Sequence, residues 1–197
     1  MITKNEVLDN LEEVKKYVSE IETKKEGIAI LNRHNDEVIF QSTKTIMKEA
    51  VEEAVENANL EGANLKGANL KDANLENANL KDANLENANL KYANLESTNL
   101  ESANLENAKL EYANLESTNL KSANLKDANL EYANLENANL KDANLKYANL
   151  ESTNLESANL KDANLKSANL ENAKTTCCTI NFLSSEKEQA EQFIKGL

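Results

Sequence analysis

Residues 88–100 read ANLKYANLESTNL, in which a leucine stands at every fifth position. Five residues of an α-helix turn through about 500°, so successive leucines would scatter around the helix instead of forming one apolar side. In a single β-strand, an odd spacing would send alternate leucines to opposite faces of the sheet. Neither regular element explains this period.

The same spacing continues along most of the chain without a slip. Leucine recurs at every fifth position from Leu60 to Leu170, which makes twenty-three leucines in register. One place before each leucine stands asparagine, except at Lys109, and one place after it stands Glu or Lys. Two places before each leucine stands alanine, except at Thr98, Thr118 and Thr153. A unit of five residues cannot bury its own leucine, so neighbouring units must stack and share a core.

The units ANLEN, ANLKD, ANLKY and STNLE closely resemble the pentapeptide-repeat family, from about Asn57 to Asn172 and without an insertion. The resemblance implies an all-β repeat solenoid, a right-handed quadrilateral parallel β-helix in which each unit makes one side and four units make a coil. Residues 57–183 would then form about six coils, and the leucine period would be one side plus one corner. We expect the asparagines to form ladders between coils and the threonine hydroxyls to find backbone partners.

Residues 1–56 precede the repeat and contain a predicted helix, hairpin and capping helix. The first helix is predicted from about Lys4 to Lys25, because Thr3 and Glu6 match a capping box. Its apolar residues alternate spacings of four and three, which is typical of a coiled-coil seam. Two roles stay open for the seam: packing against the chain's own hairpin, or self-association into a homo-oligomer. The seam consists of Val7, Leu11, Val14, Val18 and Ile21.

The stretch GIAILNRHNDEVIF predicts two short strands around a polar turn at residues 32–36. The stretch TIMKEAVEEAVEN then predicts a second helix that would cover the first coil. An exposed coil edge would otherwise present unpaired backbone groups and leucines. The apolar side of this helix would consist of Ile46, Ala50, Val51, Ala54 and Val55.

The five-residue pattern weakens at the other end of the repeat. Cys178 falls on an inward position and Cys177 on an outward one, and we expect both to be reduced thiols. Ser185 and Glu188 match a second capping box, which predicts a short helix within residues 184–197. That helix would lie over the last coil or pair with another copy of the chain.

Composition excludes several functional classes. A net charge of −12 argues against direct binding of nucleic acid or of an anionic membrane, and the apolar runs are too short to span a bilayer. The sequence has no phosphate-binding loop, nucleophile elbow or metal-ligand spacing, and its one histidine, His34, falls in the polar turn. We therefore expect a cytoplasmic protein that is not an enzyme and that binds no cofactor or metal.

The four-sided coil implied by the resemblance places residues twenty apart in columns along the surface. Two adjacent sides carry ten acidic and three basic residues, net −7, whereas the other two sides carry eight of each. Three tyrosines also stack on the acidic pair of sides. We call this the acidic surface, and its candidate interaction residues are Glu76, Glu96, Glu116, Glu136, Glu156, Glu111, Glu131, Glu151, Tyr92, Tyr112 and Tyr132.

Two functions are consistent with this surface. The first is a non-enzymatic scaffold with a structural or protein-interaction role and an unknown protein partner. The second is a DNA mimic that binds a type II topoisomerase, DNA gyrase or topoisomerase IV, because the sequence is similar to the quinolone-resistance branch of the family. About 28 Å of duplex carries roughly 16 phosphate charges. The net −7 of the acidic pair of sides is well below that charge, and lysine columns on the other sides weaken the mimicry.

Overall fold

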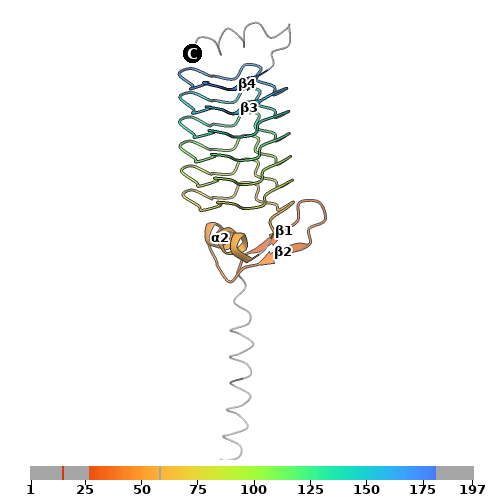
Figure 1. Ribbon diagram of the computed structural model, residues 1–197. Helices are drawn as coiled ribbons and strands as arrows, with labels where there is room; N and C mark the ends of the chain where they lie inside the picture. The colour runs from red at the N-terminus through yellow and green to blue at the C-terminus, as the bar shows by residue number, and fades with distance from the viewer. Residues whose placement is uncertain (1–14, 16–26, 58, 181–197) are drawn as a thin grey trace, which may run out of the picture.

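The computed structural model describes residue 15, residues 27–57 and residues 59–180, and it shows a stack of coils with a hairpin and a helix at one end (Figure 1). The predicted helix at residues 184–197 and the predicted seam from Val7 to Ile21 lie outside the described residues. The named elements are β1 (Ala29–Leu31), β2 (Val38–Gln41), α2 (Met47–Asn57), β3 (Asn159–Leu160) and β4 (Thr179–Ile180).

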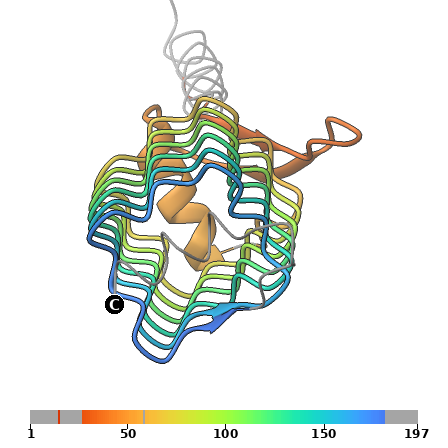
Figure 2. The same cartoon turned by 90° about the horizontal axis from the view of Figure 1, so that it is seen from above.

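Each coil contains twenty residues, because parallel backbone pairing joins positions twenty apart. Asn94 pairs with Asn114, and the same offset repeats as far as the pairing of Asn154 with Lys174. The Leu95 N–H donates to the Asn114 carbonyl at 2.7 Å, and the Asn114 N–H donates to the Ala93 carbonyl at 3.0 Å. Figure 2, viewed along the stack, shows the coils superimposed around one axis. This arrangement explains a leucine period that no helix or single strand can accommodate.

A tight turn makes each corner of a coil. The Leu110 carbonyl accepts from the Ala113 N–H at 3.1 Å, and the residue two places after the leucine, Tyr112, has a positive φ of 61°. A positive φ at only the third residue is the pattern of a type II turn. Asparagine, aspartate and glycine tolerate this left-handed conformation, and they fill many of the equivalent positions. The corner conformation therefore accounts for the small polar residues in the repeat.

The inward residues fill the interior of the stack. Leucines such as Leu110 are fully buried, and so are alanines such as Ala113. Each buried leucine contributes about 1.5–3 kcal/mol relative to an exposed one. The threonine prediction is confirmed, because the hydroxyls of Thr98 and Thr118 donate to the carbonyls of Leu75 and Leu95, each at 2.8 Å. Thr153 bonds to Leu130 in the same way at 3.0 Å.

Asparagine side chains connect the coils on the outside, as the sequence predicts. In one ladder Asn114 Nδ2 donates to Asn94 Oδ1 at 3.3 Å, and Asn134 Nδ2 donates to Asn114 Oδ1 at 3.2 Å. Each Asn Oδ1 also accepts from the backbone two residues ahead, as Asn114 does from the Glu116 N–H at 3.2 Å. Such local bonds stabilise a turn. The ladders therefore hold both the spacing of the coils and the start of each corner.

Lys109 interrupts one of these ladders, between Asn89 and Asn129. We expect Lys109→Asn to raise the free energy of unfolding by about 1–2 kcal/mol, because it restores amide bonds on both sides, each worth about 0.5–1.5 kcal/mol. Chemical denaturation measures the gain. Lys174→Asn is the matched control, because Asn154 is its one ladder neighbour among the described residues, and its gain should be smaller. Equal stability of Lys109→Asn and the wild type would contradict the expectation.

The hairpin and α2 meet the first coil. β1 and β2 form the predicted pair of strands around a turn, and they pair antiparallel with Ile30 opposite Phe40. The end of β1 meets the first coil through an antiparallel bridge between Asn32 and Ala63, in which the Asn64 N–H donates to the Leu31 carbonyl at 2.7 Å. On another side the Asn74 N–H donates to Glu52 of α2 at 2.8 Å. These contacts satisfy backbone groups that the first coil would otherwise expose.

One residue of the predicted apolar side of α2 is placed differently. Ala50, Val51 and Ala54 are fully buried, whereas Ile46 is 57% exposed. The helix begins at Met47, so Ile46 lies before the first residue of the helical period. At the far end, Cys178 is partly buried against the core and Cys177 is exposed, as predicted from their places in the unit.

Candidate interaction surface

Three tyrosines stack along one corner of the coils. The ring centroids of Tyr92 and Tyr112 are 5.1 Å apart with an interplanar angle of 10°, and those of Tyr112 and Tyr132 are 4.9 Å apart at 11°. All three side chains are about half exposed, at 53%, 50% and 47%. Lys71 Nζ lies 5.7 Å from the Tyr92 centroid. Tyr147 is separate, as predicted, and lies under Lys146 at 4.6 Å. The stack is thus a continuous aromatic ridge that is open to solvent.

One column of carboxylates, which runs from Glu76 to Glu156 with one residue per coil, accepts hydrogen bonds from asparagine amides of the next coil. Asn94 Nδ2 donates to Glu76 Oε2 at 3.2 Å, and Asn114 Nδ2 donates to Glu96 Oε2 at 3.2 Å. The same bond is made to Glu116 at 3.4 Å and to Glu136 at 3.2 Å. Hydrogen bonds to ionised groups are stronger than neutral ones. One oxygen of each of these four carboxylates is therefore fixed.

Glu111 is more enclosed than the other carboxylates of the acidic surface to which the sequence assigned it. It is only 9% exposed, and Lys91 Nζ lies 2.6 Å from its Oε1. Its Oε2 is buried and has no hydrogen-bond partner among the described residues. Because Glu111 is paired with Lys91 and is enclosed by neighbouring atoms, its carboxylate is not accessible to a partner protein. Glu131 and Glu151, which follow it in the same column, stay half-buried and reachable.

Electrostatic coupling links the tyrosines to the charged residues beside them. Burial raises the pKa of Tyr112, and Tyr132, Tyr92, Glu131 and Glu111 raise it further. The hydrogen bond to Glu111 raises the pKa of Lys91, so the Lys91 ammonium stays charged at neutral pH. Tyr112, in the middle of the ridge, therefore presents a neutral phenol group beside carboxylates.

The other two sides pair their charges internally. Lys66 lies 2.9 Å from Glu86, and Lys126 lies 2.7 Å from Glu106, each across one coil step. Hydrogen bonds from Lys126 and Asn124 lower the pKa of Glu106. These sides have no net charge to attract a charged partner, in contrast to the acidic surface.

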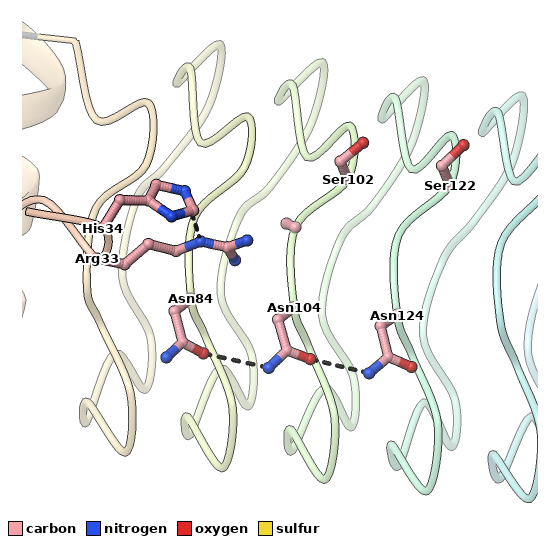
Figure 3. A pocket seen from close by; sticks show the side chains of 8 residues that line it. Arg33, His34, Asn84, Ser102, Asn104, Ser122 and Asn124 are labelled. Carbon is pink, nitrogen blue, oxygen red and sulfur yellow. Dashed lines mark hydrogen bonds between the residues drawn. The ribbon is translucent and has the colours of Figure 1, made fainter.

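A polar groove lies where the hairpin turn overhangs the coils (Figure 3). Arg33 points along the coils, donates through Nε to His34 at 3.1 Å and reaches the Ala83 carbonyl at 3.4 Å. The groove has a volume of about 510 Å³, and its remaining walls are Asn84, Ser102, Ala103, Asn104, Ser122 and Asn124. The sequence did not predict this groove, because no periodic signal records where a hairpin side chain meets the repeat. Its neutral walls and single guanidinium make it a weaker candidate than the acidic surface.

Within residues 27–57 and 59–180, no group of three or more His, Cys, Asp or Glu side chains is placed to hold a metal ion. Over the same part of the chain, no helix has the length and apolar character needed to cross a bilayer. His34 is exposed in the hairpin turn, as predicted.

Several solved structures of pentapeptide repeat proteins are similar to this chain. Rfr23, a pentapeptide repeat protein from the cyanobacterium Cyanothece 51142, is 36% identical over 60% of this chain and 91% of its own, with a TM-score of 0.53. HetL, a pentapeptide repeat protein involved in heterocyst differentiation regulation from the cyanobacterium Nostoc sp. strain PCC 7120, is 36% identical with a TM-score of 0.42. The match covers 61% of this chain and 63% of HetL.

QnrB1, a plasmid-mediated fluoroquinolone resistance protein, is 15% identical over 63% of this chain and 71% of its own, with a TM-score of 0.38. Among curated proteins, none matches this sequence. The family match is to pentapeptide repeats in eight copies, over residues 56–91, 68–107, 88–127, 123–162 and 138–174. This chain belongs to the pentapeptide-repeat family, whose members form right-handed quadrilateral β-helices.

Proposed function

We propose that this protein is a non-enzymatic scaffold that binds the basic surface of another protein through its acidic surface. The observation that carries the proposal is the exposed tyrosine stack beside carboxylates, on the two sides that hold all the net charge of the repeat. Tyrosine is enriched at protein interfaces because it supplies a large rigid contact with a polar end. Opposite charge on a partner accelerates and orients docking.

The fixed carboxylates support the same proposal. Adjacent carboxylates in a column repel one another, and the Asn amides hold them in place without neutralising them. Two unit charges 5 Å apart repel by about 0.8 kcal/mol in water. A cationic partner would relieve this repulsion. The ion-paired columns on the other two sides offer no such gain.

The test compares two variants with the same change in net charge. One converts Glu116, Glu131, Glu136 and Glu151 to glutamine, and the matched control converts Glu61, Asp127, Asp142 and Asp162 on the other sides to the corresponding amides. Immobilised protein captures partners from a lysate, and mass spectrometry quantifies them. We expect capture by the first variant to fall at least tenfold while the control retains the wild-type partners. Unchanged capture by the first variant would refute the proposal.

A type II topoisomerase is the specific partner that the DNA-mimic alternative names. The observation that favours it is a carboxylate column, Glu76 to Glu156, repeating once per coil along the stack. Titration of the purified protein into a DNA gyrase supercoiling assay, with and without a fluoroquinolone, tests this alternative. Inhibition or protection at low micromolar concentration, lost in the four-glutamine variant, would identify gyrase as the partner. No effect would exclude gyrase and leave the basic-surface proposal to the capture experiment.

A further inference from the structure

We propose that the segment recognised by the acidic surface is a basic α-helix that lies along the axis of the coils, against the tyrosine stack. This inference rests on the proposed function and specifies the shape of the partner. Its basis is a match between two spacings, that of the coils and that of turns of an α-helix. The chemistry of the surface then sets which side chains the helix must carry.

The acidic surface repeats at the spacing of the coils. The tyrosine centroids lie 5.1 and 4.9 Å apart, and the carboxylates follow the same coil repeat. Along the chain, Tyr132 comes directly after Glu131 and four residues before Glu136, so a carboxylate column stands on each side of the tyrosines. A partner that contacts several successive coils must therefore present side chains about 5 Å apart along a line.

An α-helix meets this requirement and an extended strand does not. One face of a helix recurs every turn, about 5.4 Å, whereas one face of a strand recurs about every 6.6–6.8 Å. Over the four steps from Glu76 to Glu156 the surface advances about 20 Å, the helix about 22 Å and the strand about 27 Å. After four coils the helix differs from the surface by less than half of one coil spacing, whereas the strand differs by more than one coil spacing.

The side chains of the surface favour arginine on that helix. The aliphatic part of arginine packs on apolar surface while its head reaches water or a carboxylate. Its planar guanidinium stacks on aromatic rings and binds carboxylates with two parallel hydrogen bonds. The half-exposed Tyr112 and Tyr132 offer the apolar surface, and Glu131 and Glu136 offer acceptors beside it.

The charges also locate the binding region along the stack. The column that contains Glu111, Glu131 and Glu151 begins with two lysines, Lys71 and Lys91. Lys91 is paired with Glu111. Beyond this pair the two columns are acidic as far as Glu151 and Glu156. The basic helix therefore lies over the coils that contain Tyr112 and Tyr132, away from the hairpin end.

The experiment uses the full chain and two synthetic peptides of identical composition, each about 18 residues long. One peptide places arginines at i, i+4, i+7 and i+11, which form one face of a helix. The other places the same arginines at alternate positions, which form one face of a strand. Fluorescence anisotropy measures the Kd of each peptide, and circular dichroism reports helix formation on binding. We expect the helical-face peptide to bind at least tenfold more tightly.

Variants of the protein identify where the peptide binds. Tyr112→Ser and Tyr132→Ser together should weaken the helical-face peptide about fivefold or more, and serine already occupies this corner conformation at Ser117, with φ 56°. The four-glutamine variant should weaken both peptides, and the matched amide control neither. Equal binding of the two peptides, tighter binding of the alternating one, or indifference to the tyrosines would overturn the helix proposal alone. Failure of both peptides to bind would overturn the proposed function with it.

Discussion

Leu115→Ala is expected to lower the free energy of unfolding by about 3–5 kcal/mol. Leu115 lies in the middle of the stack and is fully buried. Its N–H donates to the Asn134 carbonyl at 2.7 Å, so the backbone on both sides is held by the pairing of the coils. Because that pairing fixes the coil spacing, the cavity cannot collapse, and the substitution loses both the apolar transfer energy and the packing around it.

Chemical denaturation followed by circular dichroism measures this loss. Leu115→Met keeps the volume and should cost less than about 1.5 kcal/mol. Thr118→Ala is a second control, because it removes one hydroxyl bond and restores the alanine that most coils have at this place. It should cost about 1 kcal/mol or less. If Leu115→Ala cost no more than these controls, the leucines would not form the shared core described above.

Much of the stack could be predicted from the sequence because the same unit is repeated so often. The period of five, the inward alanine and leucine, and the asparagine ladders all recur with the coils, so each of them was visible many times over. The stacking of Tyr92, Tyr112 and Tyr132 followed from the twenty-residue coil, which the resemblance to the pentapeptide-repeat family implied. Repetition turns a weak local preference into a strong prediction.

The details that the sequence did not yield depend on contacts specific to one place. Glu111 has the same position in its unit as Glu131, and it is buried because Lys91 stands one coil away. Ile46 has the right spacing for α2, but the helix begins one residue later. The groove at Arg33 depends on how the hairpin crosses the coils. None of these contacts recurs, so no periodic signal records them.

The columns of charged residues are of two kinds: some form ion pairs within the protein, and one is acidic throughout. Where a Lys and a Glu are neighbours in a column, the structure has ion pairs such as Lys66 with Glu86 and Lys126 with Glu106. Exposed pairs of this kind contribute about 0–1 kcal/mol each. The column from Glu76 to Glu156 has no such pairing among the described residues, and its first four carboxylates accept hydrogen bonds from asparagine amides. This column therefore adds repulsion within the protein and attraction for a cationic partner.

Val51→Asp is expected to reduce stability by about 4 kcal/mol or more and to open the hairpin end of the stack. Val51 is fully buried in α2 and belongs to the same core as Leu60 and Leu65. A buried carboxylate without a partner is among the most destabilising changes a core can receive. Displacement of α2 would also break the contact of Glu52 with the Asn74 N–H and expose backbone donors of the first coil.

Two measurements separate loss of the helix from loss of the whole fold. Hydrogen exchange should accelerate first in residues 47–57 and in the first coil, while amides near Leu135 stay protected. Light scattering should show concentration-dependent self-association, because an uncovered coil edge is a template for pairing with another chain. Glu56→Gln, an exposed change in the same helix, is the control and should leave both readouts unchanged. A monomeric Val51→Asp variant with normal protection at the first coil would show that α2 does not cover that edge in solution.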